Sequence, residues 1–233
     1  MSLIYLIRHG QAGSRDNYDV LSELGQKQAR LLGEYLAAQS IRPDMVFSGN
    51  FYRQRLTAEI ACRAFSRSPE IIVDSRWDEF RLSALYRAFA PRLAAESEEF
   101  ARDFEEMQSA IIADPHTTRG ATGRCDRAMV TAWMANRFSY DGESWQEFQS
   151  RIHSLVPELS NHGGDQTVVV FTSATPISIL TGAALGLRDE QLLRLMGVVY
   201  NSSITVTKAQ EEGLRLFTYN STPHLPEPLK TLR

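Results

Sequence analysis

The tripeptide Arg8-His9-Gly10 lies where the first apolar run of the chain ends. Leu3–Ile7 has the pattern of a short buried strand, and Gly10 interrupts it. Histidine can attack phosphorus as a nucleophile, and arginine presents a planar fork of donors that fits a phosphate. Open α/β sheets bind ligands at the carboxyl ends of their strands, so this position predicts a phosphate site. The alternative interpretation is a surface ion pair for Arg8 and a structural hydrogen bond for His9.

Two arginines follow a second predicted strand, Met45–Ser48. Arg53 and Arg55 fall in the first turns of a helix expected over residues 52–65. An arginine near a helix N-terminus adds its forked donor to the favourable end of the helix dipole. We predict that Arg53 is a phosphate ligand, whereas Arg55 fits a solvated helix face better.

Two further candidates follow predicted strands. Glu79 comes shortly after Ile71–Val73, and its carboxyl could act as a general acid if its surroundings raise its pKa. An ordinary surface acid is the alternative for this residue. Ser173 follows the strongly apolar Thr167–Thr172, and the turn into the next helix exposes amides suited to an oxyanion. A plain helix cap is the alternative for Ser173.

Strands and helices alternate along most of the chain, which predicts an α/β fold. We expect a three-layer sandwich with a mostly parallel central sheet and helices on both faces. The expected helices run from the cap Ser22 to about Gln39, over residues 52–65 and 144–159, and from near Pro176 to Leu185, with a stop at Gly186. A turn is expected over residues 161–165, and a terminal hairpin should pair residues 203–207 with 214–219 across Glu212-Gly213. The proline-rich tail from Pro223 is expected to be loosely held.

The middle of the chain, residues 83–138, has no convincing strand pattern. A helical stripe is formed by Phe100, Phe104, Met107 and Ile111, and a loop over residues 114–123 precedes a helix over 126–138. This segment is too short for a secure core of its own. We therefore expect one domain over residues 1–233, with a helical cap insertion at about 83–140.

Composition narrows the class of protein. The 233 residues carry a net charge of -3, which gives no general attraction to nucleic acid or to anionic membranes. The N-terminus lacks a signal-peptide pattern, and no segment approaches the roughly 18 apolar residues that span a bilayer. Cys62 and Cys125 have no metal-site spacing and are expected to be buried thiols. These features favour a cytoplasmic enzyme whose anionic substrate is held by a few placed arginines.

The sequence resembles the histidine phosphatase superfamily, also known as the phosphoglycerate mutase-like fold, from Ile4 to about Leu225. The matching segments are Ile4–Gln11, Leu21–Ala29, Arg53 with Thr57-Ala58, Glu79 and Gly142–Phe148.

The resemblance implies a mechanism. His9 would attack phosphorus and form a phosphohistidine, while Arg8 and Arg53 hold the non-bridging oxygens through charge-assisted bonds. Glu79 would protonate the leaving oxygen and then help water to cleave the phosphoenzyme. The resemblance implies no cofactor and no metal, because the arginines supply the positive charge. The helical insertion would shape the leaving-group pocket.

The chain departs from the family pattern at Ser173, where the family normally has a second histidine. The histidines outside the tripeptide, His116, His153, His162 and His224, are not in register to replace it. A charged hydrogen bond is worth about 1.5–3 kcal/mol and a neutral one about 0.5–1.5 kcal/mol. We therefore expect Ser173 to bind phosphate more weakly and phosphoryl transfer to be weakened or retuned.

The favoured function is a metal-independent phosphatase that hydrolyses a small phosphomonoester. The alternative is a member that binds phosphorylated ligands or protein partners without turnover, which Ser173 supports. A mutase is less favoured, because the loop after Gly10 lacks the Phe-Thr-Gly-Trp-like stretch of the cofactor-dependent mutases. The sequence does not predict the substrate or the oligomeric state.

Overall fold

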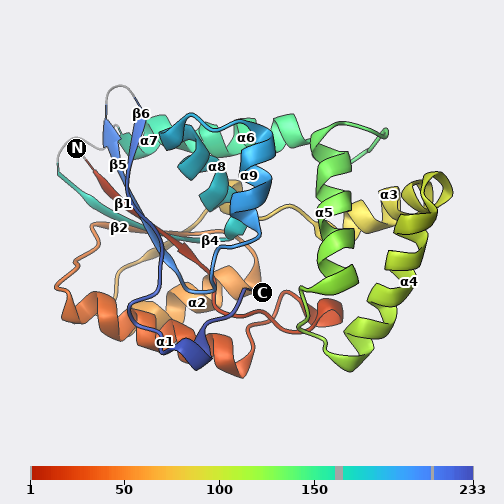
Figure 1. Cartoon of the computed structure of the whole chain (residues 1–233). Coiled ribbons are helices and arrows are strands. Elements are labelled where there is room, and N and C mark those ends of the chain that lie inside the picture. The colour runs from red at the N-terminus through yellow and green to blue at the C-terminus, as the bar shows by residue number, and fades with distance from the viewer. Residues whose placement is uncertain (1, 161–164, 211–212, 233) are drawn as a thin grey trace. The chain divides into compact units, whose positions relative to one another are not determined.

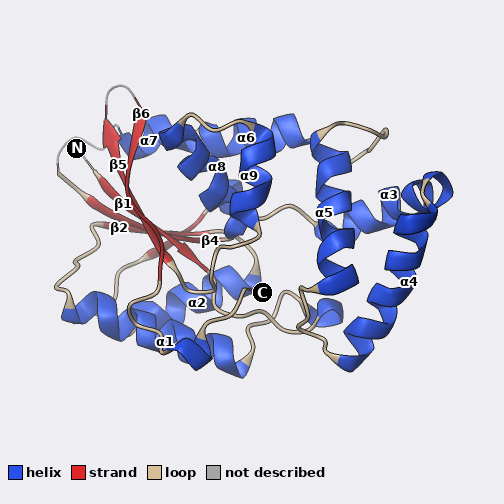
Figure 2. Cartoon of the chain, in the orientation of Figure 1, coloured by secondary structure: helices blue, strands red, loops and turns tan. Residues whose placement is uncertain are grey.

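A six-stranded mixed sheet forms the centre of the fold in a computed structural model of the chain (Figure 1). The structure describes residues 2–160, 165–210 and 213–232. The strands are β1 (Leu3–Arg8), β2 (Met45–Ser48), β3 (Ile71–Val73), β4 (Thr167–Thr172), β5 (Ile204–Gln210) and β6 (Gly213–Ser221). In the order β3-β2-β4-β1-β5-β6, the strands from β3 to β1 are parallel, and the pairings of β5 are antiparallel (Figure 2). The predicted α/β fold with a mostly parallel sheet is confirmed.

The chain divides into two compact units. The larger contains Met1–Gly13, Asn17–Glu79 and Arg151–Leu232, and the smaller is formed mainly by Phe80–Ser150 with Ser14–Asp16. The helices are α1 (Glu23–Ala38), α2 (Tyr52–Cys62), α3 (Leu82–Glu96), α4 (Glu98–Ala113), α5 (Gly120–Met134), α6 (Trp145–His153), α7 (Leu155–Ser160), α8 (Ala174–Leu185) and α9 (Asp189–Met196). The sheet, α1, α2 and α7 to α9 belong to the larger unit, and α3 to α5 belong to the smaller one.

Helices α1 and α2 cover one face of the sheet (Figure 1). Leu32 and Ala61 from these helices share a buried core with Phe171 of β4, because alternate strand residues point to the same face. Ser22 caps α1 as predicted, since its hydroxyl accepts a hydrogen bond of 3.0 Å from the Gly25 amide. Helix α2 ends at Cys62 rather than at the expected residue 65.

Helices α7 and α8 lie on the opposite face of the sheet (Figure 1). Ile177 and Leu180 of α8 are buried, as are Leu6 and Val170, which point away from α1 and α2. Helix α8 ends at Gly186, whose φ of 66° is the left-handed conformation that favours glycine. The predicted stop and the predicted helices on both faces are confirmed.

The helix expected over residues 144–159 is two helices, α6 and α7. Pro157 explains the break, because proline has no amide hydrogen to donate to the His153 carbonyl four residues earlier. Helix α9 was not predicted, although Leu192, Leu193, Leu195 and Met196 have helical spacing; Leu192 is the one buried residue of this helix.

The predicted terminal hairpin is present as β5 and β6, although its strands are longer than expected. Most of the turn expected over residues 161–165, and Glu212 of the hairpin turn, lie outside the described residues.

The expectation of a loosely held C-terminal tail is wrong. Leu225 is buried, and the Gln28 side-chain amide donates a hydrogen bond of 2.7 Å to the Leu229 carbonyl. The Asn201 amide donates one of 2.8 Å to the Thr231 carbonyl. Both Gln28 and Asn201 are fully buried, and buried polar groups need partners, so the backbone of the tail supplies them.

The smaller unit is helical, as the sequence indicates. Its helix α5 runs from Gly120 to Met134 rather than over 126–138, and Asn136 follows in the left-handed conformation (φ 49°) that ends helices. Arg15 and Tyr86 both donate hydrogen bonds to the Asp126 carboxylate, at 2.5 and 2.7 Å. The role of this unit as a cap stays a prediction.

Cys62 and Cys125 are buried free thiols, as predicted, and burial raises the pKa of Cys62 to about 12. Within the described ranges, no helix combines the length and the apolar character that a membrane crossing requires.

His224 in the tail provides a test of this packing. Burial lowers the pKa of His224 to about 4, whereas an unfolded histidine titrates near 6.5. Between these values the unfolded chain binds the extra proton, so stability is lost as the pH falls from about 6.5 towards 4. Between pH 7 and pH 4.5, the wild-type protein should lose about 2 kcal/mol more unfolding free energy than His224→Gln, because glutamine does not titrate. Urea unfolding at both pH values measures this difference, and an identical loss in both proteins would contradict it.

Candidate active site

His9 and Ser173 emerge side by side from the sheet. Arg8 is the last residue of β1 and pairs with Thr172, the last residue of β4. The His9 amide then donates a hydrogen bond of 2.9 Å to the Thr172 carbonyl. The parallel register thus places the residues after both strands at one edge of the sheet, as the sequence predicts.

The contacts of His9 define its protonation state. Its Nδ1 lies 2.7 Å from the Gly10 carbonyl oxygen, which can only accept, so Nδ1 carries the ring proton. Its Nε2 therefore holds a lone pair, which accepts a hydrogen bond of 3.2 Å from Arg53 Nε. Burial, followed by the charges of Arg53 and Arg8, holds the pKa of His9 well below its usual range. The imidazole is neutral near pH 7, which is the state that a nucleophile needs.

Arg53 is the predicted arginine that the structure brings to His9. Its guanidinium is 4% exposed, and its Nη1 donates to the Asp19 carboxylate at 3.1 Å. The guanidinium carbon also lies 4.8 Å from the Tyr18 ring centre and 4.4 Å from that of Phe51. These cation–π contacts with two rings restrict the orientation of the fork and of its remaining donors. Sequence reasoning missed these partners, because Tyr18 and Asp19 belong to a loop without periodicity.

Arg8 is buried beside the same site, but its partners were not predicted. Its Nη1 donates to the Val199 carbonyl and, at 2.9 Å, to the Leu232 carbonyl. Its Nε is buried and has no hydrogen-bond partner among the described residues. Burial lowers the pKa of Arg8, and the neighbouring Tyr18 and Glu79 act in the opposite direction. Arg8 thus lies within electrostatic reach of Glu79 and retains a buried donor that an anion could satisfy.

Glu79 and Ser173 both lie at the start of α8. The Glu79 carboxylate accepts a hydrogen bond of 3.1 Å from the Thr175 amide. Ser173 occupies the N-cap position of α8, yet its side chain makes no capping bond. Its hydroxyl instead accepts a hydrogen bond of 2.9 Å from the side-chain amide of Gln54. The alternative interpretation of Ser173 as a plain helix cap is therefore wrong.

The loop that follows β1 is held from several sides. The Gly10 amide donates to the Thr57 hydroxyl at 3.1 Å, and the His9 carbonyl accepts from the Asn201 side chain at 3.2 Å. A Cβ on Gly10 would lie 2.4 Å from the Gly25 carbonyl oxygen, so this close approach requires glycine. The structure thus holds a neutral imidazole in a fixed loop, with the guanidinium of Arg53 bonded to it and the charge of Arg8 nearby.

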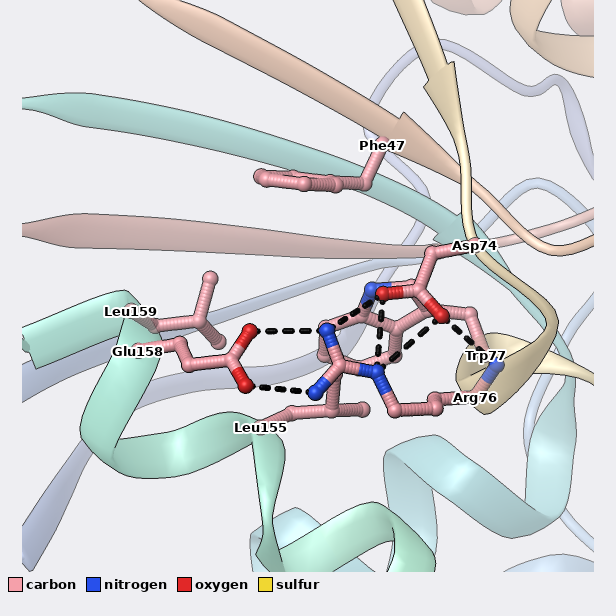
Figure 3. A pocket seen from close by; sticks show the side chains of 7 residues that line it. All are labelled: Phe47, Asp74, Arg76, Trp77, Leu155, Glu158 and Leu159. Carbon is pink, nitrogen blue, oxygen red and sulfur yellow. Dashed lines mark hydrogen bonds and ion pairs between the residues drawn. The ribbon is translucent and has the colours of Figure 1, made fainter.

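A pocket elsewhere in the larger unit contains an arginine that is already paired with two carboxylates. It is lined by Phe47, Asp74, Arg76, Trp77, Leu155, Glu158 and Leu159 (Figure 3). Arg76 donates to Asp74 at 2.7 Å and to Glu158 at 2.5 Å, so two carboxylates already surround its charge. This ion-pair cluster does not attract a phosphate. In the described parts of the chain, no group of three or more His, Cys, Asp and Glu side chains is arranged to hold a metal ion.

A family model matches most of the chain. The model of the histidine phosphatase superfamily, branch 1, matches residues 4–222. The chain belongs to this superfamily. No match was found among curated proteins.

Solved structures with the same fold include three that are named as phosphatases. Alpha-ribazole phosphatase from Shigella flexneri is 17% identical with a TM-score of 0.63, covering 94% of this chain and 96% of that chain. A mycobacterial glucosyl-3-phosphoglycerate phosphatase in complex with inorganic phosphate is 23% identical with a TM-score of 0.63, covering 96% and 99%. A histidine-to-alanine mutant of phosphoserine phosphatase from Entamoeba histolytica, in complex with phosphoserine, is 16% identical with a TM-score of 0.64, covering 97% and 100%. At these identities the likeness shows the shared histidine phosphatase fold.

Proposed function

We propose that this histidine phosphatase superfamily member hydrolyses a small phosphomonoester through a phosphohistidine at His9, without a metal. The observation that carries the proposal is the buried, neutral imidazole of His9, with its Nε2 lone pair held against Arg53. A structural histidine could bond to a loop carbonyl, but it would not need an arginine at its free nitrogen. The pairing suits a nucleophile whose target is an anion.

In the first step, Arg53 Nε would exchange its bond to His9 for a phosphoryl oxygen, and the freed lone pair of Nε2 attacks phosphorus as the bond to the leaving oxygen breaks. Arg53, Arg8 and Ser173 would bind the non-bridging oxygens as charge shifts onto them. The proton stays on Nδ1, and its hydrogen bond to the Gly10 carbonyl stabilises the positive charge that the ring acquires on phosphorylation. Glu79, in its protonated form, would give its proton to the leaving oxygen.

In the second step, water attacks the phosphohistidine and the P–N bond breaks. Glu79, now a carboxylate, takes the proton of that water, which restores its first state. The electron pair of the P–N bond returns to Nε2, and inorganic phosphate leaves. The Thr175 amide supports the carboxylate form of Glu79 from the N-terminus of α8, where a negative charge is favoured.

The three phosphatases named above bear the names of different small molecules, which supports a small phosphomonoester as the substrate class. The test measures release of inorganic phosphate from 4-nitrophenyl phosphate and a panel of sugar, glycerate and amino-acid phosphates, with a chelator present. We expect hydrolysis that the chelator leaves unchanged. Phosphoryl transfer to added glycerol without phosphate release would indicate a mutase. Binding of inorganic phosphate by titration, with no turnover of any panel member, would favour a ligand-binding member.

A further inference from the structure

Gln54 is a fully buried side chain that directly contacts Ser173. It lies in the first turn of α2, directly after Arg53. Its Oε1 accepts a hydrogen bond of 3.3 Å from the Phe51 amide, and its Nε2 donates to the Trp77 carbonyl at 3.2 Å and to Ser173 Oγ at 2.9 Å. One side-chain amide thus joins the start of α2, the segment before Glu79 and the end of β4.

The partners of Gln54 fix which way its amide points. The Phe51 amide can only donate and the Trp77 carbonyl can only accept, so Oε1 must face the former and Nε2 the latter. The atom at Ser173 is therefore a donor, and Ser173 Oγ must accept. The hydroxyl proton of Ser173 is then directed away from Gln54, and no hydrogen bond that this hydroxyl donates is found among the described residues.

The start of α8 also leaves this proton available. An N-cap serine normally uses its oxygen to accept from the second or third helix amide. Here the Thr175 amide donates to Glu79 instead, and the oxygen of Ser173 is taken by Gln54. Ser173 therefore has a spare donor at the edge of the sheet where His9 emerges, and that donor faces neither the helix nor Gln54.

We propose that Gln54 is a positioning residue that occupies the oxygen of Ser173 and so directs its hydroxyl proton to a phosphoryl oxygen of the substrate. The proposal rests on the proposed function, because it needs a phosphoryl group beside His9. It explains how a neutral serine serves as an oriented donor at a position where the resemblance to the family leads one to expect a histidine.

Gly49 makes room for this arrangement. A Cβ at Gly49 would lie 2.1 Å from Gln54 Oε1 and 2.9 Å from an oxygen of Asp78. The Gly49→Ala substitution would therefore displace the Gln54 amide without removing it. It gives a second way to disturb the position of Gln54 if a direct replacement fails to fold.

The test is a double-mutant cycle with Gln54→Met and Ser173→Ala, since methionine has a similar length but no donor. We expect each single substitution to lower kcat/KM for 4-nitrophenyl phosphate by about 5- to 10-fold, which lies within the roughly 2- to 13-fold range of one neutral hydrogen bond. In the Ser173→Ala background, Gln54→Met should change kcat/KM by less than about 2-fold, because its effect acts through the hydroxyl. Equal losses in both backgrounds would overturn the proposal. Gly49→Ala should repeat the pattern of Gln54→Met.

Gln28→Met is the matched control, because Gln28 is equally buried but bonds to Gln11 and the tail. Its effect should be the same with and without the Ser173 hydroxyl. The affinity for inorganic phosphate, measured in the same variants, separates this proposal from the proposed function. If no panel substrate is hydrolysed but phosphate affinity is non-additive for Gln54 and Ser173, only the proposed function fails. If hydrolysis depends on His9 but the cycle is additive, only the role of Gln54 is overturned.

Discussion

Replacing His9 with alanine is expected to lower kcat by about 10⁴-fold or more, the loss that follows removal of a catalytic nucleophile. The variant should still bind inorganic phosphate, because Arg8 and Arg53 remain to hold its oxygens. The wild-type protein, quenched after mixing with substrate, should contain an acid-labile, base-stable phosphoryl group, and the variant should contain none. Steady-state assays and mass spectrometry of the quenched protein measure the two effects.

His224→Gln is the matched control for this experiment, because His224 is also a partly buried histidine but lies in the tail, bonded to Ser202. It should keep both turnover and the trapped phosphoryl group. A phosphoryl group that persists after His9→Ala would place the nucleophile elsewhere and contradict the mechanism.

The pH dependence of kcat/KM provides a second test of the role of His9, because it reports the protonation state of the imidazole. Its pKa lies well below 6.5, and the protonated ring has no lone pair to attack with. With 4-nitrophenyl phosphate, whose leaving group needs no proton from Glu79, activity that depends on His9 should therefore stay constant from pH 8 to about 6.5 and fall only at lower pH, as the ring gains its proton. An acidic decline centred near pH 7, seen with a substrate whose own ionisation lies lower, would show that burial and the arginines do not depress the pKa of His9.

The strands could be predicted from sequence because each is a compact apolar run between turn residues. Strands β2, β3 and β4 have the predicted bounds, and Ser22 and Gly186 mark helix ends through local hydrogen bonding and backbone conformation. The tail was predicted wrongly because its order comes from long-range bonds to Gln28 and Asn201, which leave no periodic signal. Local patterns are readable in a sequence, whereas the partner of a buried amide is decided by the whole fold.

The candidate site shows the same difference between local sequence patterns and long-range contacts. His9, Arg53 and Ser173 follow strands, so topology brings them together once the sheet order is known. The orientation of each group depends on residues without a chemical signature of their own. Tyr18 stacks on Arg53, and Gln54 holds Ser173, yet glutamine or tyrosine at these spacings predicts nothing by itself. The sequence therefore predicted which side chains lie at the same edge of the sheet, and the structure was needed to see how those side chains are oriented.

Arg53→Met is expected to lower kcat/KM by about 10³-fold, because it removes the charged donor nearest to the attacking nitrogen. Loss of one preorganised donor costs on the order of 10² to 10³ in rate, and a buried guanidinium lies at the upper end of that range. Arg53→Lys should recover little, since an ammonium cannot contact His9 and bind two phosphoryl oxygens in one plane. Phosphate affinity and kcat/KM for 4-nitrophenyl phosphate are the measurements.

Arg55→Met separates this effect from a general loss of positive charge. Arg55 lies two residues further along α2, and within the described structure no hydrogen bond joins it to His9. The two substitutions remove the same charge from the same helix, so a long-range field would weaken both variants alike. A loss confined to Arg53→Met would mean that the guanidinium acts by contact, through its bond to His9 Nε2 and its stacking on Tyr18. Equal losses would instead assign the role of Arg53 to net charge and remove the geometric basis for its place at the phosphate.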